Sequence, residues 1–415
     1  MMERREFLTV AGTVALAEAT RNGEVGTRSG LARDVPRFAF PVPAFQGPTL
    51  GPDVYARRIE RLQTELEAQK LDLFVVEPGT TFQYFTGYNP GRSERLILSM
   101  IPLTGAPAIV CPSFELERIR RNSAVADVRG WEEHEDPWRL VRTAGRELKP
   151  RHRAGVAAVE PSTSYQTYLG LADRLDGWQF VNGRAVSERL RVIKRPEELA
   201  LIRRAIAATE AAIAATFAQL AVGMTERDVA QLLSREVAGR RSPGGGLVQF
   251  GPSSALPHGG PSAGRLERET IVLIDAGSRV EGYTSDITRT IWFGDTPSAE
   301  FRQVFNLVHD AQTAAMQAGK PFVTRCQDLD RLARKVITDG GYGRFFTHRL
   351  GHGMGMDGHE VPYLVEGNET RLEPGMVFTI EPGIYQLNKF GVRIEDDCVM
   401  TDGGIEVLSH RPAKV

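Results

Sequence analysis

The chain of 415 residues is long enough for two domains, and its 25% charged and 41% hydrophobic residues are typical of an ordinary globular protein. The formal net charge of −1 gives no support for a surface that binds nucleic acid or anionic lipid. Three distant cysteines, Cys111, Cys326 and Cys398, form no CxxC pair and no disulfide framework. No apolar run reaches the roughly 18 residues that would suggest a membrane span.

Residues 1–19 have the pattern of an export signal rather than of a folded element. Arg4-Arg5 precede an apolar stretch from Phe7 to Ala17, and Ala17-Glu18-Ala19 matches an A-x-A cleavage site. Paired arginines before such a stretch resemble a twin-arginine signal, so we expect a periplasmic or other extracytoplasmic protein. The alternative is a cytoplasmic protein with a frayed amphipathic N-terminus.

The segment 20–53 reads as a linker, because it holds five prolines and scattered glycines, and residues 54–190 read as a first α/β domain. Apolar residues at helical spacing predict a helix over 55–70. Short apolar runs then predict buried strands, followed by a further helix. The strands are expected at 71–76, 96–101 and 106–110, and the helix at 114–121. We find no catalytic constellation in this domain.

A second domain spans residues 191–415. Its first helix begins at Pro196, with acidic residues in the first turn, and is expected to run to about Leu220. Thr225 is expected to cap the next helix. Further along the chain we expect a strand at 247–250 and helices at 299–318 and 326–339.

Residues 271–291 predict a β-hairpin that brings two aspartates together. If the turn centres between Val280 and Glu281, Asp275 lies directly opposite Asp286. Side-chain alternation then places Asp286 on one face with the threonines of its strand. Two facing carboxylates repel each other, and a cation between them is the simplest remedy. The alternative is a pair of turn aspartates in solvent.

Three of the eight histidines fall within twelve residues that also hold four glycines. They are His348, His352 and His359. The glycines exclude a helix interior and leave a backbone that can bring imidazoles close to a ligand. A single histidine would more often be structural, but three in such a segment favour a binding site.

Two further carboxylates occupy favourable positions near the end of the chain. Glu381 ends the apolar strand that is expected over 376–380. Glu395 follows Arg393 by two residues, so the two side chains share one strand face. The neighbouring aspartates are expected in a turn or at the surface: Asp396 and Asp397.

Four carboxylates and one imidazole therefore form a set of donors that look buried. They are Asp275, Asp286, His352, Glu381 and Glu395. This hard, oxygen-rich set favours manganese, cobalt or iron over the zinc of thiolate sites. Four negative charges suit two divalent ions better than one, and shared carboxylates would hold the ions roughly 3.5–4 Å apart. We expect manganese first, with cobalt, iron or zinc as alternatives.

The motifs around these donors resemble those of the pita-bread metallopeptidases, a superfamily that includes Xaa-Pro aminopeptidase, prolidase, methionine aminopeptidase and the metal-free creatinase. The motifs are Asp275-Ala-Gly, Ser285-Asp286, Gly351-His352-Gly, Ile380-Glu381-Pro-Gly and Arg393-Ile-Glu395-Asp. The resemblance covers about 190–415. The preceding domain is similar, more weakly, to the creatinase-type N-terminal domain through Tyr84-Phe-Thr-Gly-Tyr88.

The resemblance implies an α/β (α+β) fold, in which a creatinase-like N-terminal α/β domain precedes a pita-bread catalytic domain. The catalytic domain would hold a curved, mainly antiparallel sheet flanked by helices. The size of the N-terminal domain disfavours methionine aminopeptidase, and the intact ligand set disfavours creatinase.

The resemblance also implies a reaction and roles for the site residues. The bond between an N-terminal residue and a following proline would be cleaved by a hydroxide that bridges two metal ions. Glu381, besides binding metal, would shuttle the proton. His258 and His359 would hold the substrate and the oxyanion. His348 would line the proline pocket, and Arg393 would orient Glu395.

We therefore expect a dinuclear Xaa-Pro aminopeptidase that acts on small proline-containing peptides and forms a homodimer. The main alternative is a prolidase, which cleaves Xaa-Pro dipeptides with the same metal ligands and differs in how the far end of the cleft is blocked. A non-catalytic binding module on the same fold is a third possibility, although all five ligand positions are retained. Hydrolysis of a non-peptide substrate by the same site is a fourth.

Overall fold

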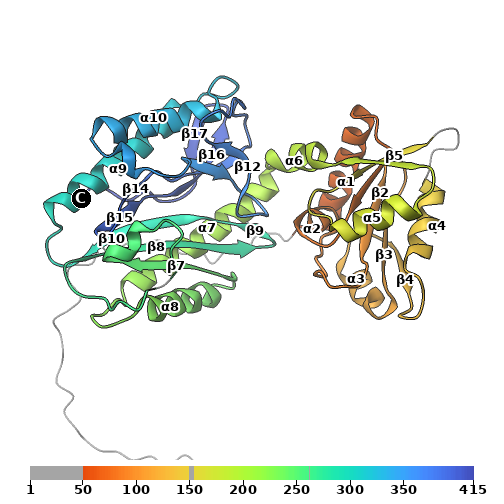
Figure 1. Cartoon of the computed structure of the whole chain (residues 1–415), viewed down its shortest axis with the longest axis horizontal. Coiled ribbons are helices and arrows are strands. Elements are labelled where there is room, and N and C mark those ends of the chain that lie inside the picture. Colours follow the sequence, from red (N-terminus) through yellow and green to blue (C-terminus); the bar gives the residue numbers. More distant parts are fainter. Residues whose placement is uncertain (1–49, 149–153, 261) are drawn as a thin grey trace, which may run out of the picture. The chain divides into compact units, whose positions relative to one another are not determined.

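The computed structural model describes residues 50–148, 154–260 and 262–415. The export signal expected at 1–19 and most of the linker expected over 20–53 lie outside the described residues, so both stay predictions. Over the described part of the chain, no helix is long and apolar enough to cross a membrane. Figure 1 shows the helices and strands coloured along the sequence.

The first part of the described chain forms a mixed sheet of six strands with helices in its connections (Figure 1). The strands are β1 (Leu73–Val76), β2 (Leu98–Pro102), β3 (Ala108–Pro112), β4 (Asp127–Trp131), β5 (Gly155–Val159) and β6 (Trp178–Asn182). The helices are α1 (Pro52–Ala68), α2 (Thr80–Thr86), the 3-10 turn η1 (Ser113–Glu115), α3 (Leu116–Asn122), α4 (Trp138–Leu148), α5 (Tyr165–Arg174) and α6 (Arg184–Val192). The expected helices and strands of this domain are confirmed, with small differences at their ends.

The order of strands in this sheet is β4-β3-β2-β1-β5-β6. Strand β1 pairs antiparallel with β2 and parallel with β5. Strands β1, β2 and β3 are buried along their whole length, as the short hydrophobic runs predict.

The second part of the chain holds longer helices and antiparallel strands. The helices are α7 (Pro196–Phe217), α8 (Glu226–Gly239), η2 (Gly251–Ala255), α9 (Ala299–Ala318), α10 (Cys326–Asp339) and η3 (Gly343–Phe345). The first strands are β7 (Gly244–Phe250), β8 (Thr270–Val280), β9 (Tyr283–Thr284) and β10 (Ile287–Phe293). The later strands are β11 (Gly351–Gly353), β12 (Glu360–Leu364), β13 (Val377–Ile380), β14 (Gly383–Gln386), β15 (Phe390–Arg393), β16 (Asp396–Thr401) and β17 (Gly404–Val407).

These strands form three sheets. One has the order β10-β8-β7 with β9 paired to β8, one has the order β12-β11-β13-β16-β17, and β14 pairs with β15. The expected bounds of α9 and α10 are confirmed at both ends. The cap at Thr225 is also confirmed, because its hydroxyl oxygen accepts the Asp228 N–H at 3.1 Å.

The main core of this domain lies between α9, α10 and the sheet that contains β13. In α9, four buried side chains recur at the spacing of one helix face: Phe301, Val304, Phe305 and Val308. They pack in one cluster with side chains from α10 and β13, including Leu329, Ile337 and Phe378. The hydroxyl oxygen of Ser298 accepts the Phe301 N–H at 3.1 Å and begins α9.

The hairpin of β8 and β10 differs from the sequence expectation in its register. Asp275 lies opposite Thr288 rather than Asp286, because the turn centres on Glu281-Gly282, one residue later than expected. Both turn residues have positive φ, 52° and 89°, as in the two-residue turns that match the twist of the strands. A pairing shift of two residues leaves every side chain on its original face. Asp275 and Asp286 therefore still approach each other, as diagonal rather than direct neighbours.

Candidate active site

A cavity of about 430 Å³ collects every site residue that the sequence predicts. The predicted residues that line it are His258, Asp275, Asp286, His348, His352, His359, Glu381, Arg393 and Glu395. Pro257 and Arg349, which the sequence did not single out, complete the lining.

The carboxylates and two histidines form three overlapping groups of possible ligands among the described residues. Within each group, one donor atom from every residue lies within 4.8 Å of the others. The groups are Asp275, Asp286 and Glu395; His352, Glu381 and Glu395; and Asp286, His352 and His359. Because the groups share Asp286, His352 and Glu395, the donors form one continuous set that could hold divalent cations.

Backbone pairing brings these donors in from separate strands. His352 in β11 donates its N–H to the Thr379 hydroxyl at 3.1 Å. Glu381 directly follows β13 and donates its N–H to the Leu350 carbonyl at 2.8 Å. Pro382 lacks an N–H and cannot extend the strand, so β13 ends where the Glu381 carboxylate meets the cavity.

The carboxylates repel one another in a setting that is only partly open to solvent: Glu395 is buried, whereas the Asp275 and Asp286 side chains are 26% and 22% exposed. Burial raises the pKa of Asp286 well above its usual range, and the Asp275 charge adds to the effect. Burial and the Asp286 charge likewise raise the pKa of Glu395. The Arg393 guanidinium lowers both pKa values without offsetting these effects. An oxygen-rich set of this kind fits divalent cations, which would neutralise the charges.

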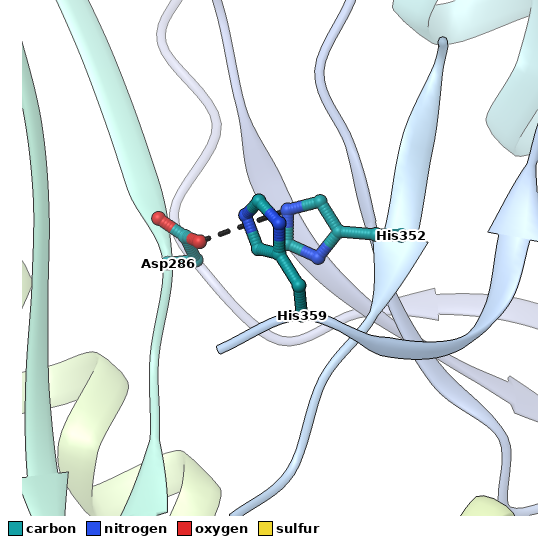
Figure 2. A group of neighbouring side chains, drawn as sticks. All are labelled: Asp286, His352 and His359. Atoms are coloured by element: carbon teal, nitrogen blue, oxygen red, sulfur yellow. Dashed lines mark ion pairs between the residues drawn. The ribbon is translucent and has the colours of Figure 1, made fainter. Parts of the chain in front are cut away.

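His352 presents a specific nitrogen to this set. Its Nδ1 lies 3.1 Å from the Gly353 carbonyl, which can only accept, so Nδ1 carries a proton and Nε2 is the nitrogen that faces the carboxylates and would bind a metal. Nε2 lies 3.2 Å from Glu381 Oε1 and 3.8 Å from Asp286 Oδ2. Figure 2 shows the Asp286 carboxylate pointing at the His352 ring, with the His359 ring beside it.

The pKa of Glu381 is lowered, whereas the pKa values of Asp286 and Glu395 are raised. Burial alone would raise the pKa of Glu381, but the hydrogen bond and charge of His352, with smaller contributions from His348 and Arg393, lower it to about 2. Glu381 therefore stays ionised at neutral pH, which suits a carboxylate that binds a metal ion.

Arg393, Tyr385 and His348 form a chain of hydrogen bonds along the cavity. Arg393 Nη2 donates to Asp275 Oδ2 at 2.6 Å, and its Nη1 donates to the Tyr385 hydroxyl at 2.8 Å. His348 Nδ1 lies 2.6 Å from the Arg349 carbonyl and therefore carries the proton of the neutral ring, so the Tyr385 hydroxyl donates to His348 Nε2, 2.8 Å away. Burial lowers the pKa of His348, consistent with a neutral ring, and raises the pKa of Tyr385 to about 12. Arg393 reaches Glu395 through the Thr288 hydroxyl, which it contacts at 3.0 Å and which donates to Glu395 at 2.6 Å.

His359 and His258 are exposed at the same cavity. The His359 ring centroid lies 3.8 Å from that of His352, and His359 Nδ1 lies 3.2 Å from Arg349 Nη2. Because a guanidinium only donates, Nδ1 is the acceptor and Nε2 carries the His359 proton. Partial burial and the His352 and Arg349 charges lower the pKa of His359 to about 4.

The expectation that Asp396 and Asp397 are turn or surface residues is wrong. Both are fully buried at the start of β16. Asp396 accepts from Arg289 Nη2 and Gln312 Nε2, each at 2.8 Å. Asp397 accepts the backbone N–H of Asp286 at 3.1 Å, and burial raises the pKa of Asp397 well above its usual range. The two aspartates therefore support the strands behind the donors.

No role was predicted for Tyr385, Arg349 or Thr288. The alternation that places Thr288 on the strand face of Asp286 was recognised, but its bond to Glu395 was not predicted. Arg349 stands directly after His348 and offered no signal beyond that position. Tyr385 lies four residues after Glu381, and its role depends on a cross-strand geometry that spacing does not reveal.

Comparison with known proteins places this geometry in a family. The model of the Creatinase/Prolidase N-terminal domain matches residues 58–193, and the model of Metallopeptidase family M24 matches residues 200–402. The chain is 35% identical to an Xaa-Pro dipeptidase of Lactobacillus helveticus over 358 residues, which are 85% of this chain and 96% of the relative.

Solved structures with the same fold include a dipeptidase PepE from Mycobacterium ulcerans, with 35% identity and a TM-score of 0.81 over 89% of this chain and 99% of that one. They also include an X-Pro aminopeptidase from Thermotoga maritima, with 29% identity and a TM-score of 0.75 over 84% of this chain and 98% of that one.

The fold and the carboxylate-rich cavity thus define a metal-dependent peptidase, built from a creatinase-like N-terminal domain and a pita-bread catalytic domain. The chain belongs to metallopeptidase family M24. The expected α/β architecture and family are confirmed, and the family implies divalent metal ions. The role of each individual side chain stays a prediction.

Proposed function

We propose that the protein hydrolyses Xaa-Pro dipeptides. One observation carries the proposal: a single cavity joins the predicted metal ligands to three further histidines and two arginines. The dipeptidase names of similar proteins from Lactobacillus helveticus and Mycobacterium ulcerans support the dipeptide as substrate. An aminopeptidase was the first expectation from the sequence, whereas the names of these similar proteins favour a dipeptidase.

Bound divalent ions, which we propose to be two manganese ions held by Asp275, Asp286, His352, Glu381 and Glu395, would activate water and polarise the scissile carbonyl. The ionised Glu381 accepts the proton of the attacking water and returns it to the proline nitrogen that leaves. The Nε2–H of His359 donates to the oxyanion, and His258 is placed in the same cavity to assist. His348 is held by Tyr385 with its ring against the cavity, where it would contact the proline.

The proposal is tested by assaying metal-stripped protein that has been reloaded with manganese, cobalt, iron or zinc. An Xaa-Pro dipeptide should be cleaved, and an Xaa-Ala dipeptide should be cleaved far more slowly. The absence of turnover of every proline peptide with every metal would contradict the proposal. Tight peptide binding without turnover would favour the non-catalytic module instead.

Arg349 bears on the choice between dipeptides and longer peptides. A dipeptide carries a free carboxylate directly after the proline, and a cation is needed to bind it. The Arg349 guanidinium carbon lies 4.5 Å above the Tyr363 ring centroid, and Nη2 lies against His359. Arg393, the other guanidinium at the cavity, is engaged with Asp275 and Tyr385.

We predict that Arg349→Ala raises KM for an Xaa-Pro dipeptide by about 10-fold or more, the loss expected for one charge-assisted hydrogen bond. The KM for the amidated dipeptide, which lacks the carboxylate, should change little. Steady-state kinetics with both substrates measure the effect, and the exposed Arg344→Ala serves as a matched control. An equal rise in KM for both substrates would show that Arg349 does not bind the substrate carboxylate.

A second candidate function is that of an Xaa-Pro aminopeptidase, which removes the first residue from longer peptides. The similarity to the Thermotoga maritima X-Pro aminopeptidase favours it. Cleavage of Xaa-Pro tripeptides at a rate similar to that of dipeptides would support this candidate. We also propose a homodimer, which sedimentation or light scattering would test.

We further propose export through the twin-arginine route, on the pattern of residues 1–19. The double change Arg4→Lys and Arg5→Lys should leave the full-length protein in the cytoplasm, because the paired arginines are the recognised feature of such a signal. Cell fractionation and N-terminal sequencing measure the outcome. Unchanged processing in the exported fraction would refute the proposal.

A further inference from the structure

The short segment that carries His359 is bracketed by two acidic residues that bind one arginine. Arg191, at the end of α6, donates from Nη2 to Asp357 Oδ2 at 2.6 Å and to Glu360 Oε2 at 2.5 Å. Asp357 precedes His359 by two residues and Glu360 follows it directly. A single guanidinium therefore holds the backbone on both sides of the imidazole.

Neighbouring side chains complete this arrangement. The Thr80 hydroxyl donates to the second oxygen of Asp357 at 2.5 Å, and Arg191 Nη1 donates to the Thr81 hydroxyl at 3.2 Å. The ammonium of Lys194 binds the second oxygen of Glu360, and only 1% of the Lys194 side chain is exposed. The Glu360 side chain is 10% exposed, so its pairs with Arg191 and Lys194 are screened less than surface pairs, whereas the Asp357 side chain is 42% exposed.

Electrostatics agree with this pairing. Burial alone would raise the pKa of Asp357, but the Arg191 guanidinium and the Thr80 hydroxyl hold it below its usual range. Asp357 is thus ionised at neutral pH, and Arg191 lies within ion-pair distance of both acidic residues.

Packing contributes little at the residue next to His359. A Cβ added at Gly358 would meet no atom within 4 Å, so no neighbouring atom packs against the backbone on that side. The preceding residues are anchored from elsewhere: Arg279 donates to the Met356 carbonyl at 2.7 Å. From Asp357 up to β12, the two acidic side chains are held by Arg191, Thr80 and Lys194. The Gly355 N–H also donates to the Asp357 carbonyl at 3.1 Å, and Arg349 Nη2 contacts the His359 ring itself at 3.2 Å.

We infer that Arg191 is a positioning residue for the peptidase reaction, which holds His359 beside His352 and Asp286 (Figure 2). The inference rests on the proposed function, since His359 acts on the substrate there. Arg191 lies in the domain that matches the Creatinase/Prolidase N-terminal model, which gives that domain a direct part in catalytic geometry. Misplacement of a reacting group by about 1 Å can cost about 100-fold in rate.

The kinetic test compares Arg191→Ala with the wild type after both are loaded with the same metal. We expect kcat for an Xaa-Pro dipeptide to fall by about 10- to 100-fold, with metal content unchanged. Arg191→Lys, which keeps the charge but not the paired donors, should recover part of the loss. Arg184→Ala is the matched control. Arg184 and Arg191 both line a second cavity of about 330 Å³, but Arg184 forms its ion pair with Glu188 of its own helix. If Arg191→Ala does not fold, Asp357→Asn takes its place.

A double variant tests whether Arg191 acts through His359 or stabilises the protein independently of it. If Arg191 acts through His359, adding Arg191→Ala to His359→Ala should change kcat by less than about twofold, the usual margin of additivity. An unchanged kcat in Arg191→Ala, or the same fold loss in both backgrounds, would overturn the inference.

Hydrogen exchange supplies a readout that needs no activity. Amides of residues 354–360 should exchange faster in Arg191→Ala than in the wild type or Arg184→Ala, and unchanged exchange would overturn the inference. If the wild type cleaves no proline peptide while this exchange still rises, the proposed function fails and the holding role of Arg191 stands.

Discussion

Asp286→Asn should remove most of the bound metal and activity while making the metal-free protein more stable. The carboxylate lies among other buried acids and is a predicted ligand. Loss of an outer partner of a metal site already costs 10- to 100-fold, so loss of a direct ligand should cost about 100-fold or more in activity. The same change removes one of the repelling charges from the metal-free site.

The sign of the stability effect follows from proton linkage. The folded-state pKa values of Asp286 and Glu395 are raised, so above the ordinary carboxyl pKa of about 4 the folded protein binds protons that the unfolded chain has released. The free energy of unfolding of the metal-free protein therefore falls as pH rises from about 4 through the raised pKa values. Asparagine does not titrate, so the free energy of unfolding of metal-free Asp286→Asn should fall less as pH rises than that of the metal-free wild type.

Elemental analysis and thermal melts at neutral pH, with and without metal, measure both effects. Each kcal/mol regained should raise the Tm of the metal-free protein by about 2–4 °C. Asp173→Asn, at an exposed aspartate, is the matched control. Full metal occupancy with normal turnover in Asp286→Asn would refute the ligand assignment.

His359→Ala and His258→Ala should each lower kcat by about 100-fold or more, the loss expected when one oxyanion donor is removed. Metal content should stay near normal, because the predicted ligand set does not need either ring. The fall should appear in kcat and in kcat/KM alike, since a contact made in the transition state is lost.

The pKa of His359, lowered to about 4, adds a pH criterion. The ring is neutral from neutral pH down to about 4, so its protonation should reduce activity only as pH approaches that value. Thermal melts, metal analysis and dipeptide kinetics are the measurements, with the exposed His134→Ala as control. A variant that is destabilised but fully active per folded molecule would end the assignment for that histidine.

The local features of this chain were predictable from sequence because their causes are local. Helix α9 has a serine cap at Ser298 and an apolar face at regular spacing, so both of its ends were placed correctly. The predicted metal donors were found because each stands in a short motif. The hairpin register was missed by two residues because nothing marked Glu281, a residue that rarely adopts positive φ, as part of the turn.

Features that depend on distant partners were not predictable. Asp396 was expected at the surface, yet it is buried with Arg289 and Gln312, which precede it by 107 and 84 residues. Arg191 binds Asp357, which follows it by 166 residues in the chain. Sequence spacing carries no information about such pairs, because they form only when separate elements meet in the folded protein.

The wide separation of the predicted donors along the chain also constrains how the protein acquires its metal. They come from segments between Asp275 and Glu395, and they meet only after β8, β11, β13 and β15 have come together. Contacts between residues so far apart form slowly in folding, since long loops must close first. A nascent or partly folded chain would therefore lack the assembled site, and metal would enter after folding. For a protein that crosses a membrane already folded, metal selection would then belong to the compartment in which it folds.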